Sequence, residues 1–127
     1  MELAALDDGG PALALADVRG PAVVNLWATW CAPCREELPA FQEVAAARPD
    51  VRFLGVNSQE TGAAREYLDE LGITYEQFVD QRGELAEALG AVGLPVTVVI
   101  DADGTIATEH LGPMSVGDLE DALAAVD

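Results

Sequence analysis

The chain has 127 residues, of which 50% are hydrophobic and 23% are charged, a globular composition with enough residues for one hydrophobic core. Its six basic residues are all arginine and face 23 acidic residues, so the formal net charge of −17 makes nucleic acid and anionic lipid unfavourable partners. No stretch reaches the roughly 18 consecutive apolar residues that a membrane-spanning helix needs.

The acidic residues are spread along the chain and do not form a tail, which favours a general solubility role over a specific basic partner. Residues 1–8 carry acidic side chains and no basic region, which is not the pattern of a secretory signal. We therefore expect either the mature part of an exported protein or a cytoplasmic protein.

The first predicted elements are a short strand and turn over residues 11–18 and a second strand over residues 22–27. The second strand is apolar at almost every position, as in a central strand that is buried on both faces. It leads directly into the segment Ala28-Thr29-Trp30-Cys31-Ala32-Pro33-Cys34, after which the pattern becomes helical.

The predicted helix that follows Cys34 ends before Pro49-Asp50 and has one apolar face. Pro39 lies inside this helix and is expected to kink it. The residues that recur at helical spacing on the apolar face are Leu38, Phe41, Val44 and Ala45. The acidic residues expected away from that face are Glu36, Glu37 and Glu43.

The rest of the chain alternates strands and helices. The predicted elements are a strand over 51–56, a helix over 61–71 between Thr61 and Gly72, a brief strand over 78–79, a short helix over 84–89, a strand over 96–100, a hairpin turn over 101–104, an edge strand over 105–111 and a helix that begins after Ser115. Strands joined by helices imply parallel pairing, and the tight hairpin implies an antiparallel end. The sequence therefore predicts an α/β fold in a single domain, residues 1–127, with a central mixed sheet flanked by helices on both faces.

Cys31 and Cys34 are the only two cysteines, and they lie where the predicted central strand meets a helix. Free N–H groups and the positive end of the helix dipole stabilise a thiolate there, so Cys31 is predicted to be the attacking sulfur. Cys34 lies one turn further into the helix and suits the resolving role. Pro33 fits the first helical turn because it has no N–H to satisfy. We therefore expect thiol–disulfide exchange.

Two other interpretations of the cysteine pair are a zinc site and inert buried thiols. A structural zinc ion needs about four ligands. The only histidine, His110, lies in the predicted edge strand and away from the pair, so neither a metal nor a cofactor is expected. Trp30 is interpreted as an exposed part of a substrate groove beside Cys31, with a core aromatic residue as the alternative.

Residues 24–39, with the sequence VNLWATWCAPCREELP, resemble the active-site segment of TlpA/ResA-type thioredoxin-like proteins. The likeness continues through Gly55-Val56-Asn57, Glu60, Gly93-Leu94-Pro95-Val96-Thr97 and the turn at 101–104. It implies a thioredoxin-like fold in which Pro95 is a cis-proline that faces the cysteine pair. The substrate-binding residues that the resemblance implies are Trp30, Ala32, Pro33, Leu94 and Pro95.

Glu60 matches an acidic residue that lies near the disulfide in ResA-like proteins, so the resemblance implies that Glu60 assists proton transfer at the catalytic cysteines. The alternative is an ordinary loop acid. Asn25 stands where thioredoxin has a buried aspartate, and an asparagine cannot titrate. This difference shifts the expected proton-handling role toward Glu60.

The resemblance implies a thiol–disulfide oxidoreductase that exchanges electrons with protein disulfides through Cys31 and Cys34. We expect an extracytoplasmic reductant, as in cytochrome c maturation. The expected partners are protein thiols and disulfides, apocytochrome c among them, and a membrane redox protein that recycles the enzyme. A monomer is expected, attached to the membrane by an anchor outside this chain, with a cytoplasmic location as the alternative.

Two other functions stay open from the sequence. A protein of the same fold could instead be an oxidant that forms disulfides, because no residue fixes the direction of electron flow. A non-catalytic binding module is the alternative from a different class. In such a module the disulfide would act only as a covalent link.

Overall fold

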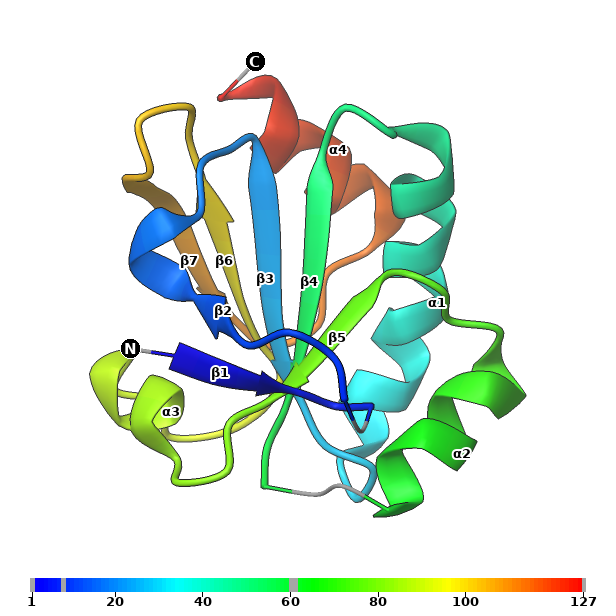
Figure 1. The fold of residues 1–127 in the computed structure, drawn as a ribbon. Helices are drawn as coiled ribbons and strands as arrows, with labels where there is room; N and C mark the ends of the chain where they lie inside the picture. The colour runs from blue at the N-terminus through cyan, green and yellow to red at the C-terminus, as the bar shows by residue number, and fades with distance from the viewer. Residues whose placement is uncertain (1, 8, 60–61, 127) are drawn as a thin grey trace.

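The computed structural model describes residues 2–7, 9–59 and 62–126, which form a mixed β-sheet with helices on both faces (Figure 1). The described strands are β1 (Glu2–Ala5), β2 (Leu13–Ala14), β3 (Ala22–Trp27), β4 (Arg52–Asn57), β5 (Glu76–Val79), β6 (Val96–Ile100) and β7 (Ile106–Leu111). The described helices are α1 (Ala32–Ala47), α2 (Gly62–Leu71), α3 (Glu84–Ala88) and α4 (Val116–Ala124), with a 3-10 turn, η1, over Leu15–Asp17.

The sheet runs in the order β2-β1-β5-β4-β3-β6-β7. β3, β4 and β5 are parallel to one another, whereas β6 is antiparallel to β3 and β7 is antiparallel to β6. β1 is antiparallel to both β5 and β2. The α/β fold with a mixed central sheet, predicted from the order of strands and helices, is therefore confirmed.

The central strand β3 separates two hydrophobic cores because successive side chains of a strand point to opposite faces. Val23 packs in a cluster with residues of α1 and α4, and Trp27 packs in a cluster with residues of α1 and α2. Val24 and Leu26 lie on the other face, in the cluster that includes Leu85 of α3. All six residues of β3 are buried, as the sequence predicts for a central strand.

The helix at the cysteine pair begins at Ala32, so that Pro33 lies in its first turn as predicted, and it continues through Pro39 to Ala47. α2 ends at Leu71, and Gly72 adopts the left-handed backbone conformation (φ 71°) that suits a glycine after a helix. The predicted cap of this helix, Thr61, lies outside the described residues. α4 begins after Ser115, as predicted.

The strand β1 was not predicted from the sequence. Its residues Ala4 and Ala5 pair with Val79 and Phe78 of β5. Leu3 is buried in the core cluster that also contains Val24 and Leu26. The four-residue strand has little pattern of its own and forms because β5 provides an edge for it. In Figure 1, β1 crosses in front of the lower end of the sheet, on the side of α3.

Candidate active site

A disulfide bond joins Cys31 and Cys34 at the junction between β3 and α1. Cys31 is the N-cap of α1, and its sulfur accepts a hydrogen bond from the backbone N–H of Cys34 at 3.2 Å. Pro33 lies in the first turn of α1, where its missing N–H costs no hydrogen bond. The N-terminus of α1 therefore directs both its dipole and a backbone donor at the Cys31 sulfur.

The two sulfur-bearing residues differ in their access to solvent. Cys31 is 5% exposed and Cys34 is fully buried. Their neighbours Ala32 and Pro33 are exposed at the surface. A partner can therefore approach Cys31, while Cys34 can react only with a group already bonded at Cys31.

The predicted groove residues differ in their exposure to solvent. Trp30 is 71% exposed on the turn before Cys31. Leu94 is half-buried and packs against the cluster that contains both cysteines. The Leu94–Pro95 peptide bond is cis, as the resemblance implies, and the carbonyl of Pro95 accepts a hydrogen bond from Gly112 at 2.8 Å.

Aromatic residues form the floor beneath the disulfide. The ring of Trp27 stacks on that of Tyr67 from α2, with ring centroids 5.6 Å apart. The guanidinium carbon of Arg35 lies 5.1 Å from the centroid of the Tyr67 ring, in a cation–π contact. The indole N–H of Trp27 donates to Gln77 Oε1 at 3.1 Å, which satisfies its one buried donor.

The prediction that Glu37 lies away from the core is wrong. Glu37 is only 2% exposed, and its carboxylate is held by two donors. Asn25 Nδ2 donates to Oε1 at 2.8 Å, and the backbone N–H of Met114 donates to Oε2 at 2.9 Å. The same Asn25 amide approaches Thr97 Oγ1 at 3.3 Å. Glu37 on α1 therefore bonds to β3 and to the loop before α4, and Asn25 extends the contact to β6.

Burial raises the pKa of Glu37 from 4.5 to about 7, while the hydrogen bonds from Met114 and then Asn25 act in the opposite direction. A carboxyl with such a pKa can gain or lose a proton near neutral pH. Glu37 follows Cys34 by three residues on α1, which places both on one face of the helix. The helical spacing Cys34, Glu37, Phe41, Val44 is the sequence signal that would have identified Glu37 as buried.

The expected acid Glu60 lies outside the described residues, so its role stays a prediction. Asn25, which replaces the buried aspartate of thioredoxin, is not isolated. Its side chain is a hydrogen-bond donor to the carboxylate of Glu37. The group that can titrate in this part of the core is therefore the Glu37 carboxyl on α1, and not a side chain on β3.

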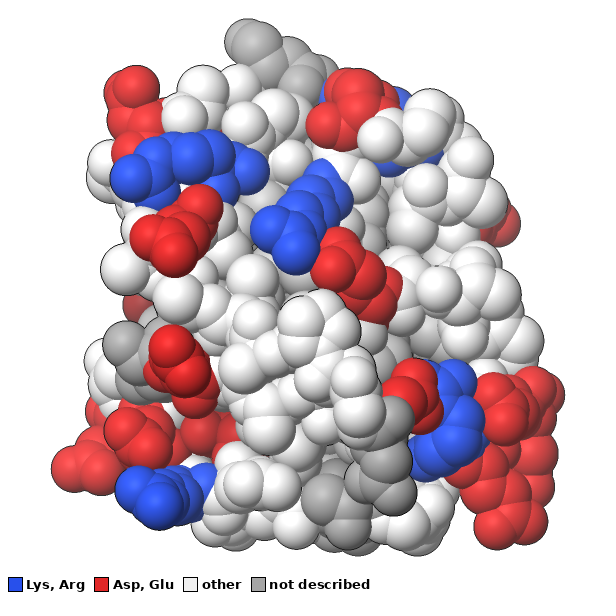
Figure 2. Space-filling view, in the orientation of Figure 1, with Lys and Arg blue, Asp and Glu red and all other residues white. Residues whose placement is uncertain are grey.

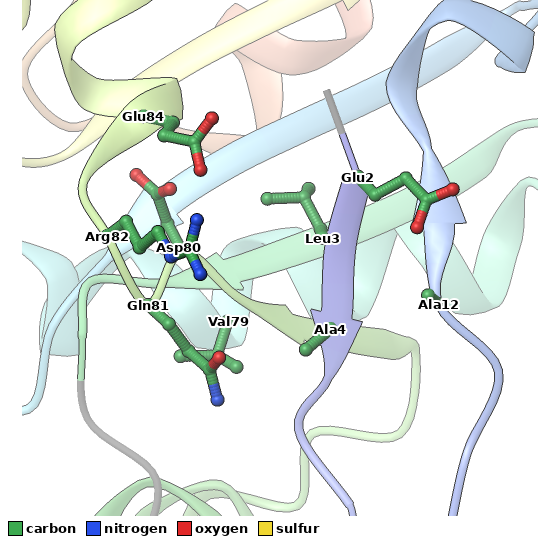
Figure 3. Close-up of a pocket in the computed structure, with 9 residues that line it drawn as sticks. All are labelled: Glu2, Leu3, Ala4, Ala12, Val79, Asp80, Gln81, Arg82 and Glu84. Atoms are coloured by element: carbon green, nitrogen blue, oxygen red, sulfur yellow. The ribbon is translucent and has the colours of Figure 1, made fainter.

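A polar hollow of about 400 Å³ lies between β1 and the segment that leads from β5 into α3 (Figure 3). Its buried acid, Asp80, accepts hydrogen bonds at 3.1 Å from the backbone N–H groups of both Leu85 and Ala86. Asp80 therefore satisfies two backbone N–H groups in the first turn of α3, and we interpret the hollow as structural. In the described part of the chain, no group of three or more potential ligand residues is arranged to hold a metal ion.

The sheet order, the cis-proline and the CxxC disulfide at a helix N-terminus define the class of thioredoxin-fold thiol–disulfide oxidoreductases. The comparisons with known proteins agree. Residues 1–109 match the family model described as AhpC/TSA family, and the chain belongs to this family.

Three relatives illustrate the class. The thiol:disulfide interchange protein DsbE of Pseudomonas fluorescens biotype C is 38% identical over 92% of this chain and 66% of its own length. The thiol-disulfide oxidoreductase ResA of Bacillus thuringiensis subsp. konkukian is 28% identical over 92% of this chain and 70% of its own length. A solved structure of a secreted Mycobacterium tuberculosis disulfide oxidoreductase homologous to E. coli DsbE has a TM-score of 0.86 and 28% identity, covering 98% of this chain and 95% of that chain.

The resemblance to ResA-type proteins is therefore confirmed. The chain spans about two thirds of the length of these curated relatives. Across the described residues, no helix combines the length and the apolar character that crossing a membrane requires.

Proposed function

We propose that this protein exchanges two electrons with protein disulfides through Cys31 and Cys34. The observation that carries this proposal is the unequal pair of cysteines at the N-terminus of α1. Cys31 caps the helix and keeps 5% of its surface exposed, whereas Cys34 is fully buried one turn further along. Such a pair supports one sulfur that attacks and one that resolves.

In the reducing direction, the Cys31 thiolate attacks one sulfur of a substrate disulfide. A bond forms between that sulfur and Cys31, and the other substrate sulfur leaves as a thiolate. The Cys34 thiolate then attacks the sulfur of Cys31 and releases the second substrate thiol. The substrate gains two electrons, and the protein ends with the Cys31–Cys34 disulfide.

The second step needs a base, because Cys34 is buried and its thiol must lose a proton before it attacks. Glu37 supports this role, since it is buried on the same helix face and has a pKa of about 7. We propose that Glu37 accepts the Cys34 proton. Glu60 stays a candidate for the same task on the strength of the resemblance alone.

Substrate recognition is proposed for the exposed rim around the disulfide. Trp30, Ala32 and Pro33 are exposed and would offer one side of this surface, and the half-buried Leu94, with the buried Pro95 after it, would offer the other. An extended peptide beside Leu94 would pair with its backbone by strand addition.

An extracytoplasmic reductant is the proposed direction, acting on protein disulfides such as that of apocytochrome c and recycled by a membrane redox partner. The related mycobacterial oxidoreductase is a secreted protein, which supports an extracytoplasmic location. Equilibration with glutathione buffers measures the reduction potential of the pair. A value below about −230 mV would support a reductant, and a value near about −120 mV would instead support an oxidant.

Replacement of Cys31 tests the proposal directly. C31S is expected to lower the reduction of a model disulfide protein to the uncatalysed background, because the attacking sulfur is lost. C34S is the matched control. It keeps the attacking sulfur and is expected to accumulate a mixed disulfide with the substrate, detectable by mass spectrometry under non-reducing conditions.

Full activity of C31S would overturn the proposal. A wild-type disulfide that resists excess dithiothreitol while the protein stays folded would favour the alternative of a non-catalytic binding module.

A further inference from the structure

Two adjoining hollows with mostly apolar linings lie along β6 and β7, on the face of the sheet that α3 covers. One has a volume of about 330 Å³ and is lined by Val96, Leu111 and the segment that follows α3. The other has a volume of about 220 Å³ and is lined by Val98 and Ile106 among others. Leu89 lines both hollows, so they form one continuous depression beside the edge of the sheet.

The large apolar side chains that the described structure leaves exposed are concentrated at these hollows. They are Trp30 beside the disulfide and three others, Val92, Ile106 and Leu111. All three of the latter line one of the two hollows. Exposed apolar residues that gather in one place mark an interaction surface, whereas single scattered ones do not.

The pairing of β7 with β6 fixes which side chains of β7 face the hollows. Leu111, Glu109 and Ile106 have register partners on β6 that are all buried in the core cluster beside α3. Side chains of register partners point to the same face of a sheet, so these three residues form a row, here called the β7 row. The row reads apolar, acidic, apolar, and Glu109 is the only charged residue that lines either hollow in the described structure.

β7 is also the last strand of the sheet, at its left edge in Figure 1. Across the residues that the structure describes, no strand pairs with the outer side of its six residues. A free edge of this kind accepts an extended chain through backbone hydrogen bonds. On such an added strand, every second side chain would lie beside a member of the β7 row.

The β7 row begins next to the rim proposed for the substrate. The backbone N–H of Gly112, which follows Leu111, donates to the carbonyl of Pro95 at 2.8 Å. Val92 belongs to the same loop as Leu94 and Pro95. A polypeptide whose cysteine is bonded to Cys31 could therefore continue from the rim onto β7.

We propose that the β7 row is a second contact surface for the substrate polypeptide, which binds there as an added strand. The segment that fits has an apolar side chain beside Leu111, a basic one beside Glu109 and an apolar one beside Ile106. This inference rests on the proposed function, because it names the class of polypeptide that the same enzyme would reduce. The net charge of −17 favours a basic segment and opposes both a second copy of this chain and an anionic lipid surface.

The first test uses the terminally blocked peptide Val-Thr-Lys-Thr-Val as the probe. It contains no cysteine, and in an extended conformation it carries both valines and the lysine on one face. In an NMR titration of the oxidised protein, the probe is expected to shift the methyl signals of Leu111 and Ile106. It is also expected to slow hydrogen exchange at the outward amides of β7.

The peptide Val-Lys-Thr-Thr-Val is the control for the pattern, because it has the same composition but turns its lysine to the opposite face. It is expected to bind about fivefold more weakly, the loss of one exposed ion pair. Equal affinity of the two peptides would overturn the inference, and so would an absence of any shift at β7.

Charge reversal at Glu109 tests the polarity of the row. E109K is expected to weaken binding of the probe about fivefold and to favour the peptide Val-Thr-Glu-Thr-Val instead. E120K is the matched control, since it makes the same change in net charge on α4, on the opposite face of the sheet. Equal effects of E109K and E120K would overturn the inference. L111S is expected to weaken the probe about tenfold through lost apolar contact, with circular dichroism to confirm that the variant folds.

Reduction kinetics connect the β7 row to the proposed reaction. Excess probe is expected to slow the reduction of a peptide disulfide that carries the same Val-Thr-Lys-Thr-Val segment. Reduction of hydroxyethyl disulfide, which is too small to reach β7 from Cys31, is expected to continue at the same rate. Inhibition of both reactions would place the probe on the rim of the disulfide and overturn the inference.

A second copy of the chain is the competing occupant of the β7 row. Sedimentation equilibrium is expected to show a monomer, and a dimer that L111S abolishes would overturn the inference. Because the probe contains no cysteine, its binding can also be measured on C31S, where it is expected to be unchanged. Retained activity of C31S would overturn the proposed function alone, so the two failures are distinguishable.

Discussion

At the scale of the residue, the burial of Glu37 links stability to pH. Its pKa in the folded protein, about 7, lies above the ordinary value of 4.5, so the folded state binds this proton more tightly. The resulting stabilisation is fully present below about pH 4.5 and is lost as the pH rises through 7. Raising the pH from 4.5 to about 8 ionises Glu37 and is expected to lower the free energy of unfolding by about 3 kcal/mol. Urea denaturation of the oxidised protein at several pH values measures this change.

The control for this prediction is E37Q, which cannot ionise. Its absolute stability will differ, because an amide nitrogen would face the donors Asn25 and Met114. The informative quantity is the change in unfolding free energy with pH, which should be much smaller in E37Q. Equal pH dependence in both proteins would assign the effect to other groups.

At the scale of the element, the start of α4 supports the active site through its capping box. Ser115 Oγ accepts from the Asp118 backbone N–H at 3.1 Å, and the Ser115 N–H donates to Asp118 Oδ2 at 3.0 Å. The neighbouring Met114 N–H holds Glu37. S115A is expected to lower the free energy of unfolding by about 1 kcal/mol, measured by chemical denaturation. Both side chains belong to the same capping box, so the double variant S115A/D118A should lose less unfolding free energy than the two single variants together. A loss equal to that sum would contradict this account.

At the scale of the whole molecule, the charge of −17 creates a repulsive field for anions. On the face in Figure 2, acidic side chains gather at the two lower corners, over α2 and α3. The rate at which glutathione thiolate, itself anionic, reduces the disulfide is expected to rise as salt screens this field. Cysteamine is the control reductant, because its thiolate form has no net charge. The same salt response with both reductants would show that the field does not reach the disulfide.

The sequence was sufficient to predict β3 and the Cys31–Cys34 pair, because each depends on a local pattern. An unbroken apolar run marks a central strand, and two close cysteines after it mark a helix N-terminus. Glu37 was missed because its burial depends on donors that Asn25 and Met114 bring from distant parts of the chain. The strand β1 was missed for a related reason, since its pairing with β5 is a tertiary contact.

The contrast between the two tryptophans has a practical consequence. Trp27 is fully buried, whereas Trp30 is 71% exposed and immediately precedes Cys31. Disulfides quench indole fluorescence at short range, so emission should increase when the Cys31–Cys34 bond is reduced. Iodide added to the solution should suppress the signal of Trp30 and leave that of Trp27. The protein thus carries an optical reporter of its own oxidation state, which allows redox titrations without any added label.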